Sequence, residues 1–173
     1  MNRLTKQMLA ALFTLAAMPL ALAAGSHSGG HGQGHGPDTA IGVAGDKNKV
    51  DRTIRVSMTD DMRFVPGDIQ AKHNETIRFI VKNDGKLKHE MVIGTDKELK
   101  EHYVLMMKNP EMEHDDPNQI TLAAGKTGEI VWKFSKAGKV DFACLQPGHY
   151  DAGMKGKIAV ARNTSISNAD RRR

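Results

Sequence analysis

The chain has 173 residues, a length that allows one domain of ordinary size with appended segments and excludes a large multidomain enzyme. Hydrophobic residues make up 39% and charged residues 26%, which is enough for one packed core in a globular protein. The formal net charge is +5 and the one basic cluster lies at residues 171–173, so charge gives no indication of nucleic-acid binding.

Residues 1–24 have the features of an export signal. Arg3 and Lys6 form a short positive region, residues 8–22 are almost wholly apolar, and small alanines stand near the end of the segment. A membrane anchor would need about 20 apolar residues, whereas this run is shorter and Pro19 interrupts it. We therefore expect a cleaved signal peptide and no stable membrane insertion afterwards.

Residues 25–49 are rich in glycine, serine and histidine, a composition typical of a flexible tail. Three histidines follow at intervals of four, at His27, His31 and His35. Imidazoles on a mobile chain can gather around copper or zinc, so this tail is predicted either to capture metal or to serve as a polar linker. Residues 163–173 are predicted to be a second, disordered tail.

Between the tails, residues 50–162 form the predicted domain, and their pattern favours an all-β fold. Apolar residues alternate in the predicted strands at 50–58 and 76–81, and turn signals such as Pro-Gly and Asn-Asp-Gly separate these and the other candidate strands. Seven short strands of this kind predict a β-sandwich or barrel. The strands are expected at residues 50–58, 76–81, 90–93, 119–122, 129–134, 139–144 and 156–161.

Residues 95–118 interrupt the strand pattern and carry a group of possible metal donors. Leu99, Tyr103 and Met106 recur at helical spacing, which predicts a helix over residues 96–108 packed on the sandwich. Thioethers favour Cu(I) and imidazoles can take Cu(II), so a second copper site is one hypothesis. Methionines that only fill gaps between helix and sandwich are the alternative. The candidate ligands of this second site are Met106, Met107, Met112 and His114.

The main chemistry follows the predicted strand at 139–144. Cys144 is the only cysteine, so the exported chain cannot form an internal disulfide. His149 comes five residues later and Met154 five residues after that, in a loop rich in glycine. Another histidine, His89, lies where an upstream loop re-enters the sheet. A thiolate, two imidazoles and a thioether form the ligand set of a type 1 copper centre.

Over residues 50–161 the sequence resembles the cupredoxin family of blue-copper proteins. The stretch at 110–118 and the Pro-Gly-His-Tyr before the methionine are similar to exported copper-resistance cupredoxins of Gram-negative bacteria. The resemblance implies an eight-stranded Greek-key β-sandwich with copper at one end, and a periplasmic location. Glu90 departs from the pattern, because many blue-copper proteins have asparagine or serine there in support of the site. The likeness rests on residues 62–66 (Met-Arg-Phe-Val-Pro), the strand at 77–79, the approach to His89 and the Cys144-x4-His149-x4-Met154 loop.

Two functions would use the same four ligands. In the first, the protein provides copper tolerance by binding copper ions or passing them to a periplasmic copper exporter, oxidase or redox protein. In the second, it carries electrons between periplasmic redox partners. The histidine tail and the methionine-rich insertion favour copper handling, because an electron carrier needs one buried ion and no extra exposed donors.

Three other possibilities are disfavoured: a copper oxidase, an enzyme with a cysteine nucleophile and a zinc protein. Copper oxidases use His-x-His pairs to hold further coppers, and this sequence has none. A nucleophilic Cys144 would have His149 as its base, but the loop offers no further catalytic partner. Zinc is disfavoured because zinc sites rarely include a thioether. We therefore expect a copper protein that is not an enzyme.

Overall fold

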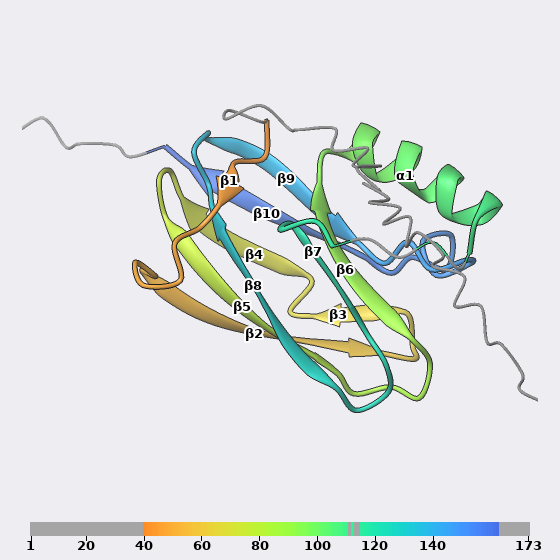
Figure 1. Cartoon of the computed structure of the whole chain (residues 1–173). Coiled ribbons are helices and arrows are strands. Elements are labelled where there is room, and N and C mark those ends of the chain that lie inside the picture. The colour runs from red at the N-terminus through yellow and green to blue at the C-terminus, as the bar shows by residue number, and fades with distance from the viewer. Residues whose placement is uncertain (1–39, 111, 113–114, 163–173) are drawn as a thin grey trace, which may run out of the picture. The chain divides into compact units, whose positions relative to one another are not determined.

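The computed structural model describes residues 40–110, 112 and 115–162. Within them, two five-stranded β-sheets face each other and one helix lies outside the pair (Figure 1). The export signal, the three tail histidines, His114 and the C-terminal tail lie outside the described residues. The elements are β1 (Val43–Ala44), β2 (Arg52–Thr59), β3 (Arg63–Val65), β4 (Asp68–Lys72), β5 (Thr76–Asn83), β6 (His89–Gly94), α1 (Asp96–Lys108), β7 (Gln119–Leu122), β8 (Thr127–Lys133), β9 (Gly138–Ala143) and β10 (Lys155–Ala161).

The strands are arranged as the predicted sandwich. One sheet has the order β1-β8-β5-β2-β3 and the other the order β4-β10-β9-β6-β7. The pairs β2–β5 and β4–β10 are parallel, so their connections pass through other strands rather than through hairpins. The prediction of an all-β sandwich with one helical insertion is confirmed.

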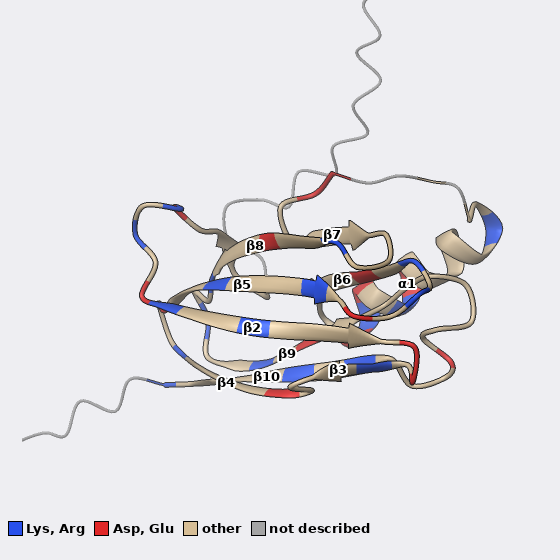
Figure 2. Ribbon diagram, turned by 90° about the horizontal axis from the view of Figure 1, so that it is seen from below, with Lys and Arg blue, Asp and Glu red and all other residues tan. Residues whose placement is uncertain are grey.

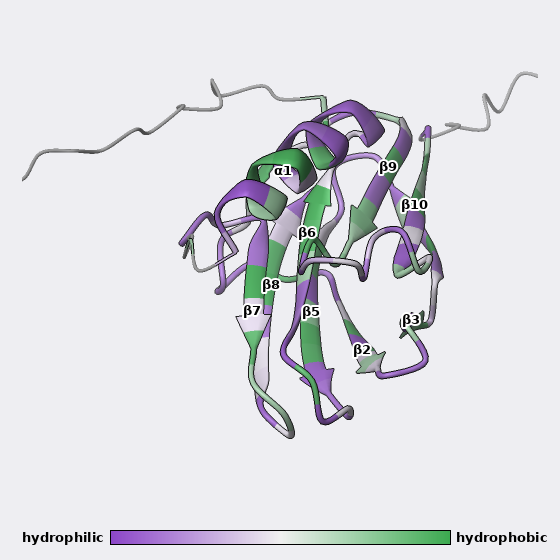
Figure 3. Cartoon of the chain, turned by 90° about the vertical axis from the view of Figure 1, so that its right-hand side faces the viewer, coloured by the Kyte–Doolittle hydropathy of each residue, from purple (hydrophilic) through white to green (hydrophobic). Residues whose placement is uncertain are grey.

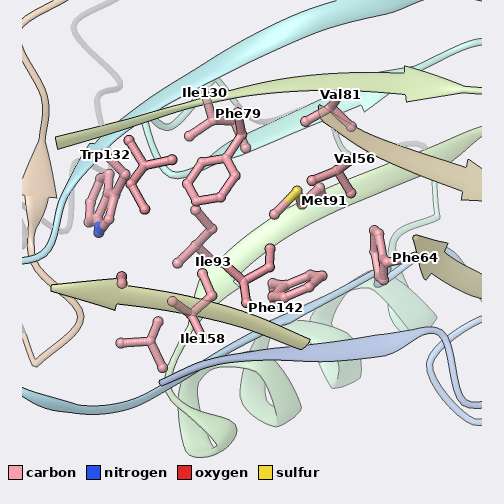
Figure 4. Close-up of a cluster of buried hydrophobic side chains, with 14 of the residues drawn as sticks. Val56, Phe64, Phe79, Val81, Met91, Ile93, Ile130, Trp132, Phe142 and Ile158 are labelled. Atoms are coloured by element: carbon pink, nitrogen blue, oxygen red, sulfur yellow. The ribbon is translucent and has the colours of Figure 1, made fainter. Parts of the chain in front are cut away.

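The core lies between the two sheets and follows from the alternation of apolar side chains. In β5, Ile77, Phe79 and Val81 are fully buried, and Phe142 of β9 approaches them from the opposite sheet (Figure 4). Phe64 and Phe142 pack edge to face with their ring centroids 5.0 Å apart. This aromatic pair joins the two sheets, because Phe64 belongs to β3 and Phe142 to β9.

Three of the described strands, β1, β3 and β4, were not predicted, which brings the number to ten where the resemblance implied eight. β3 has three residues, and β4 has two buried apolar side chains, Ile69 and Ala71, so neither shows a long alternating pattern. Short strands of this kind gain their stability from neighbouring strands rather than from their own sequence.

The folded domain begins earlier than the predicted boundary at residue 50. β1 pairs with β8, Ile41 is buried, and the Trp132 Nε1–H donates to the Ile41 carbonyl at 2.8 Å. Residues 41–45 therefore belong to the sandwich and not to the predicted tail of 25–49. A composition rich in glycine concealed this edge strand, which has only two residues.

The helix α1 has the predicted bounds and clear end signals. Thr95 accepts from the Glu98 N–H, and the Glu98 carboxylate accepts from the Thr95 N–H, which makes a capping box. Pro110 follows the C-terminal end and cannot continue the helix. Contacts to β6 and β9 place α1 against the second sheet, on the side away from the core (Figure 3).

Positions of lysine or arginine and of aspartate or glutamate are interspersed along the ribbon of the strands and turns (Figure 2). Several of these side chains form pairs between neighbouring segments, such as Arg52 with Glu75 and Lys47 with Glu129. In the part of the chain that the structure describes, no helix has the length and apolar character that a membrane crossing requires.

Candidate metal centre

Two neighbouring strands bring the predicted ligands to one end of the second sheet. β6 begins at His89, β9 ends at Ala143, and the two strands are antiparallel with Val92 opposite Ala143. The beginning of β6 therefore lies beside the end of β9, where Cys144 follows. Residues 144–154, called the copper loop below, then lead into β10.

His89, Cys144 and His149 converge at this end. Their donor atoms all lie within 4.8 Å of one another. The two Nδ1 atoms of His89 and His149 are 3.1 Å apart, and the Cys144 Sγ is 3.3 Å from the His149 Nδ1. His89 and Cys144 are buried, and His149 is half-buried. A soft sulfur and two imidazole nitrogens facing one another in a buried place fit copper.

Met154 closes the copper loop beside these residues. Its N–H donates to the His149 carbonyl, and its carbonyl accepts from the Cys144 N–H, both at 3.0 Å. The Met154 side chain is fully buried in the same apolar cluster as Cys144. Gly153, which precedes it, has a φ of +92°, a conformation that glycine adopts with little strain. The loop thus brings Met154 back beside Cys144, the residue at which the loop begins.

Asp60 supports the centre, although nothing in the sequence around it predicts this role. Its Oδ1 lies 3.0 Å from the His89 Nε2, while the Lys86 and Leu87 N–H groups donate to the same carboxylate. The Lys86 N–H contributes most to holding the pKa of Asp60 below its ordinary value, with His89 also lowering it. An ionised Asp60 favours a proton on His89 Nε2, which leaves Nδ1 to face Cys144 and His149.

Gly85 makes room for this arrangement, because a Cβ at that position would collide with the Asp60 carboxylate. No motif connects Asp60 to His89, which are 29 residues apart. A sequence signal existed only for Gly85, as part of the turn before His89.

Glu90 joins the two segments that carry the donors. Its N–H lies 3.4 Å from the Cys144 Sγ, and its buried carboxylate accepts from the Leu145 N–H at 2.8 Å. The Thr121 hydroxyl of β7 donates to the second carboxylate oxygen at 3.2 Å. Glu90 therefore supports the copper loop with a longer side chain than the asparagine or serine found in many blue-copper proteins.

Burial also sets the protonation of the donors in the absence of metal. Removal from water raises the pKa of Cys144 to about 12, although the N–H groups of Glu90 and Gln146 partly counter this effect. Burial, and to a smaller extent the nearby His89, lowers the pKa of His149. At neutral pH the site thus holds a protonated thiol and a neutral His149 imidazole.

The structure separates the described candidates for a second copper site. Met106 is buried in an apolar cluster with Leu99, Tyr103 and Tyr150, where it has the packing role. Met107 is 52% exposed and Met112 is 41% exposed. Met106 and Met107 therefore face opposite environments and are not brought together as ligands.

Comparison with known proteins agrees with the fold and the donor set. Residues 50–161 match the model of the copper binding proteins of the plastocyanin/azurin family. The sandwich and the converging His89, Cys144 and His149 donors agree with this copper-binding family. The chain belongs to the plastocyanin/azurin family, and its resemblance to the cupredoxins is confirmed.

Individual relatives support the same conclusion. The chain is similar to the copper-resistant cuproprotein CopI of Rubrivivax gelatinosus, with 50% identity over 71% of this chain and 74% of the relative. It is 34% identical to CopI of Pseudomonas aeruginosa over 70% of this chain and 82% of the relative.

Solved structures support the fold. Auracyanin B has a TM-score of 0.57 and 23% identity, and the match covers 70% of this chain and 95% of auracyanin B. The dithionite-reduced auracyanin of Roseiflexus castenholzii has a TM-score of 0.56 and 22% identity over 65% of this chain and 99% of its own.

Proposed function

We propose that this protein is a periplasmic copper-tolerance protein with a type 1 copper centre held by His89, Cys144, His149 and Met154. The observation that carries the proposal is the convergence of the Cys144 sulfur and two histidine Nδ1 atoms at a buried sheet end. The relatives named copper-resistant cuproproteins favour tolerance as its purpose. Bound there, copper supplies a centre that changes between Cu(II) and Cu(I).

The chain's own residues prepare the donors. Asp60 fixes the orientation of His89, and Glu90 holds both the Cys144 sulfur and the next residue, Leu145, through hydrogen bonds. Burial of His89 and Cys144 keeps water away from the donor atoms. Met154, buried beside them, is assigned the weak axial position. The thiol proton of Cys144 must leave when metal binds.

The exposed thioethers of Met107 and Met112 extend the proposal. Thioethers prefer Cu(I), and these two side chains are accessible to ions outside the protein. We assign them, together with His114 and the tail histidines His27, His31 and His35, to accessory copper capture. Met106 is left out because it belongs to the core.

A tolerance assay tests the proposal. A strain lacking the gene would be complemented with the wild-type chain, with Cys144→Ser, or with the exposed helix variant Lys97→Gln as the matched control. Cys144→Ser should leave cells as copper-sensitive as the deletion, because serine cannot replace a thiolate, and Lys97→Gln should restore growth. Fractionation should recover the protein from the periplasm.

If cells that produce Cys144→Ser at the wild-type level are fully copper-tolerant, the proposed role of this centre in tolerance is wrong. Wild-type complementation that changes respiration but not copper tolerance would favour the alternative, an electron carrier using the same ligands.

A further inference from the structure

The helix α1 and the copper loop share an apolar cluster on the outer side of the second sheet. The helix contributes Leu99, Tyr103 and Met106, while Leu145 and Tyr150 come from the loop. Leu145 directly follows Cys144 in the sequence, and Tyr150 directly follows His149. Cys144 itself packs into the other cluster, between the sheets. The copper loop is thus held between the sandwich core and the helix (Figures 1 and 3).

Tyr103 makes the polar contacts from the helix to this loop. Its hydroxyl donates to the Asp151 Oδ2 at 2.7 Å and accepts from the Gly148 N–H at 3.3 Å. These two partners flank His149 and Tyr150 in the sequence. The Tyr103 and Tyr150 rings stack with their centroids 5.0 Å apart and their planes inclined by 27°. One side chain therefore fixes both sides of the His149 segment.

Other parts of the loop have their own supports. Glu90 holds the Leu145 N–H, and Arg63 donates to the Ala152 carbonyl at 3.2 Å. The backbone bond from the His149 N–H ends on the Gln146 carbonyl, inside the loop. Gly148 has a φ of +82°, so the chain turns sharply just before His149. At this turn, Tyr103 is the side chain from outside the loop that holds a backbone N–H.

We propose that Tyr103 is a positioning residue for the copper centre and that α1 acts through it to fix His149. The inference rests on the proposed copper centre, to which it adds a purpose for the helix. His149 is the half-buried ligand, so it has more freedom than His89 or Cys144 unless its neighbours are held. A held imidazole keeps the ligand geometry unchanged when copper gains or loses an electron, and it slows the escape of the ion.

Tyr103→Phe is the direct test, because phenylalanine keeps the ring and removes the hydroxyl. In the metal-free protein, the Gly148 amide should exchange its hydrogen about fivefold faster, while amides of β5 stay unchanged. In the copper-loaded protein, the thiolate absorption and the copper hyperfine splitting should shift, and Cu(I) should pass to a chelator about tenfold faster. Circular dichroism and thermal unfolding would verify that the variant is folded.

Four further variants separate positioning from general packing. Asp151→Asn keeps an acceptor for the Tyr103 hydroxyl and should resemble the wild type, whereas Asp151→Ala should reproduce part of the Tyr103→Phe effect. The effects of Tyr103→Phe and Asp151→Ala should be non-additive when the two changes are combined, because both break the same hydrogen-bonded unit. Lys97→Gln, on the exposed side of α1, should leave amide exchange, spectrum and copper release unchanged.

The outcomes distinguish this inference from the proposed function. If the folded Tyr103→Phe protein keeps the wild-type spectrum, copper release and Gly148 exchange, the positioning role is wrong while the copper centre stands. If wild-type protein shows no thiolate absorption with Cu(II), the proposed centre is wrong. In that case faster Gly148 exchange alone would reduce Tyr103 to a loop contact without a metal role.

Discussion

The copper loop and the α1 insertion both contain methionine and histidine, but the two regions place them differently. In the copper loop, Cys144 and Met154 are fully buried, and a backbone hydrogen bond from the Cys144 N–H to the Met154 carbonyl joins them. In the insertion, Met107 and Met112 are exposed, and Met106 packs among apolar side chains. The comparison teaches that residue type alone does not define a metal site. The donor side chains must also converge within a rigid, buried framework.

The largest expected effect is a loss of stability that distinguishes Met106 from its neighbour Met107. Met106→Ala should lower the free energy of unfolding by about 2–5 kcal/mol, because it leaves a cavity between α1 and the sheet. Met107→Ala should change it by less than about 0.5 kcal/mol, since that side chain is largely exposed. Denaturant unfolding measures both. Equal losses of unfolding free energy would contradict the placement of Met106 in the core and Met107 at the surface.

The second effect concerns the support of His89. Asp60→Ala should weaken copper binding about tenfold to a hundredfold, because the carboxylate that orients His89 is lost. Asp61→Ala, the neighbouring exposed carboxylate, is the matched control and should bind copper normally. Competition with a chelator gives both affinities. If the two variants bind alike, Asp60 has no supporting role.

The third effect is a pH dependence. Burial raises the pKa of Cys144 to about 12 and lowers that of His149, so at neutral pH the thiol is the group that must lose a proton. Between pH 7 and pH 9 the apparent copper affinity should therefore rise about tenfold per pH unit. Calorimetry in buffers of different ionisation enthalpy should count one proton released per copper. An affinity independent of pH would mean that Cys144 is not a ligand.

The fourth effect is smaller and tests the assignment of Met154 as the weak axial ligand. Met154→Leu should leave copper bound but raise the reduction potential, because loss of a weak axial donor disfavours Cu(II). Leucine keeps most of the buried volume of methionine, so the fold should persist. Protein-film voltammetry measures the potential. A lower potential in the folded variant would show that Met154 does not have the axial role.

The sequence was informative where a local pattern was complete. β7 and α1 have the predicted bounds because alternation and helical spacing were clear within each segment. β1 and β4 were missed because each depends on pairing with a distant strand, and β3 was missed because it has only three residues, although it pairs with the adjacent β2. The proposed metal donors could be singled out because a lone cysteine, a histidine and a methionine rarely share one glycine-rich loop.

The supporting residues could not be predicted in the same way. Asp60 and Tyr103 are ordinary residue types, and they lie 29 and 45 residues from the partners that they hold, His89 and Gly148. Only the fold brings each pair together. Glu90 was noticed as a departure, but its bonds to Cys144 and Leu145 required the register of β6 against the end of β9.

The central claim is that Cys144 binds copper as a thiolate beside His89 and His149. Visible absorption during Cu(II) titration tests it most directly, with folded Cys144→Ser protein as the comparison. The wild type should develop an intense charge-transfer band that saturates at one equivalent, and Cys144→Ser should lack this band because oxygen is not an equivalent donor. An unchanged band in Cys144→Ser, or none in the wild type, would contradict the claim.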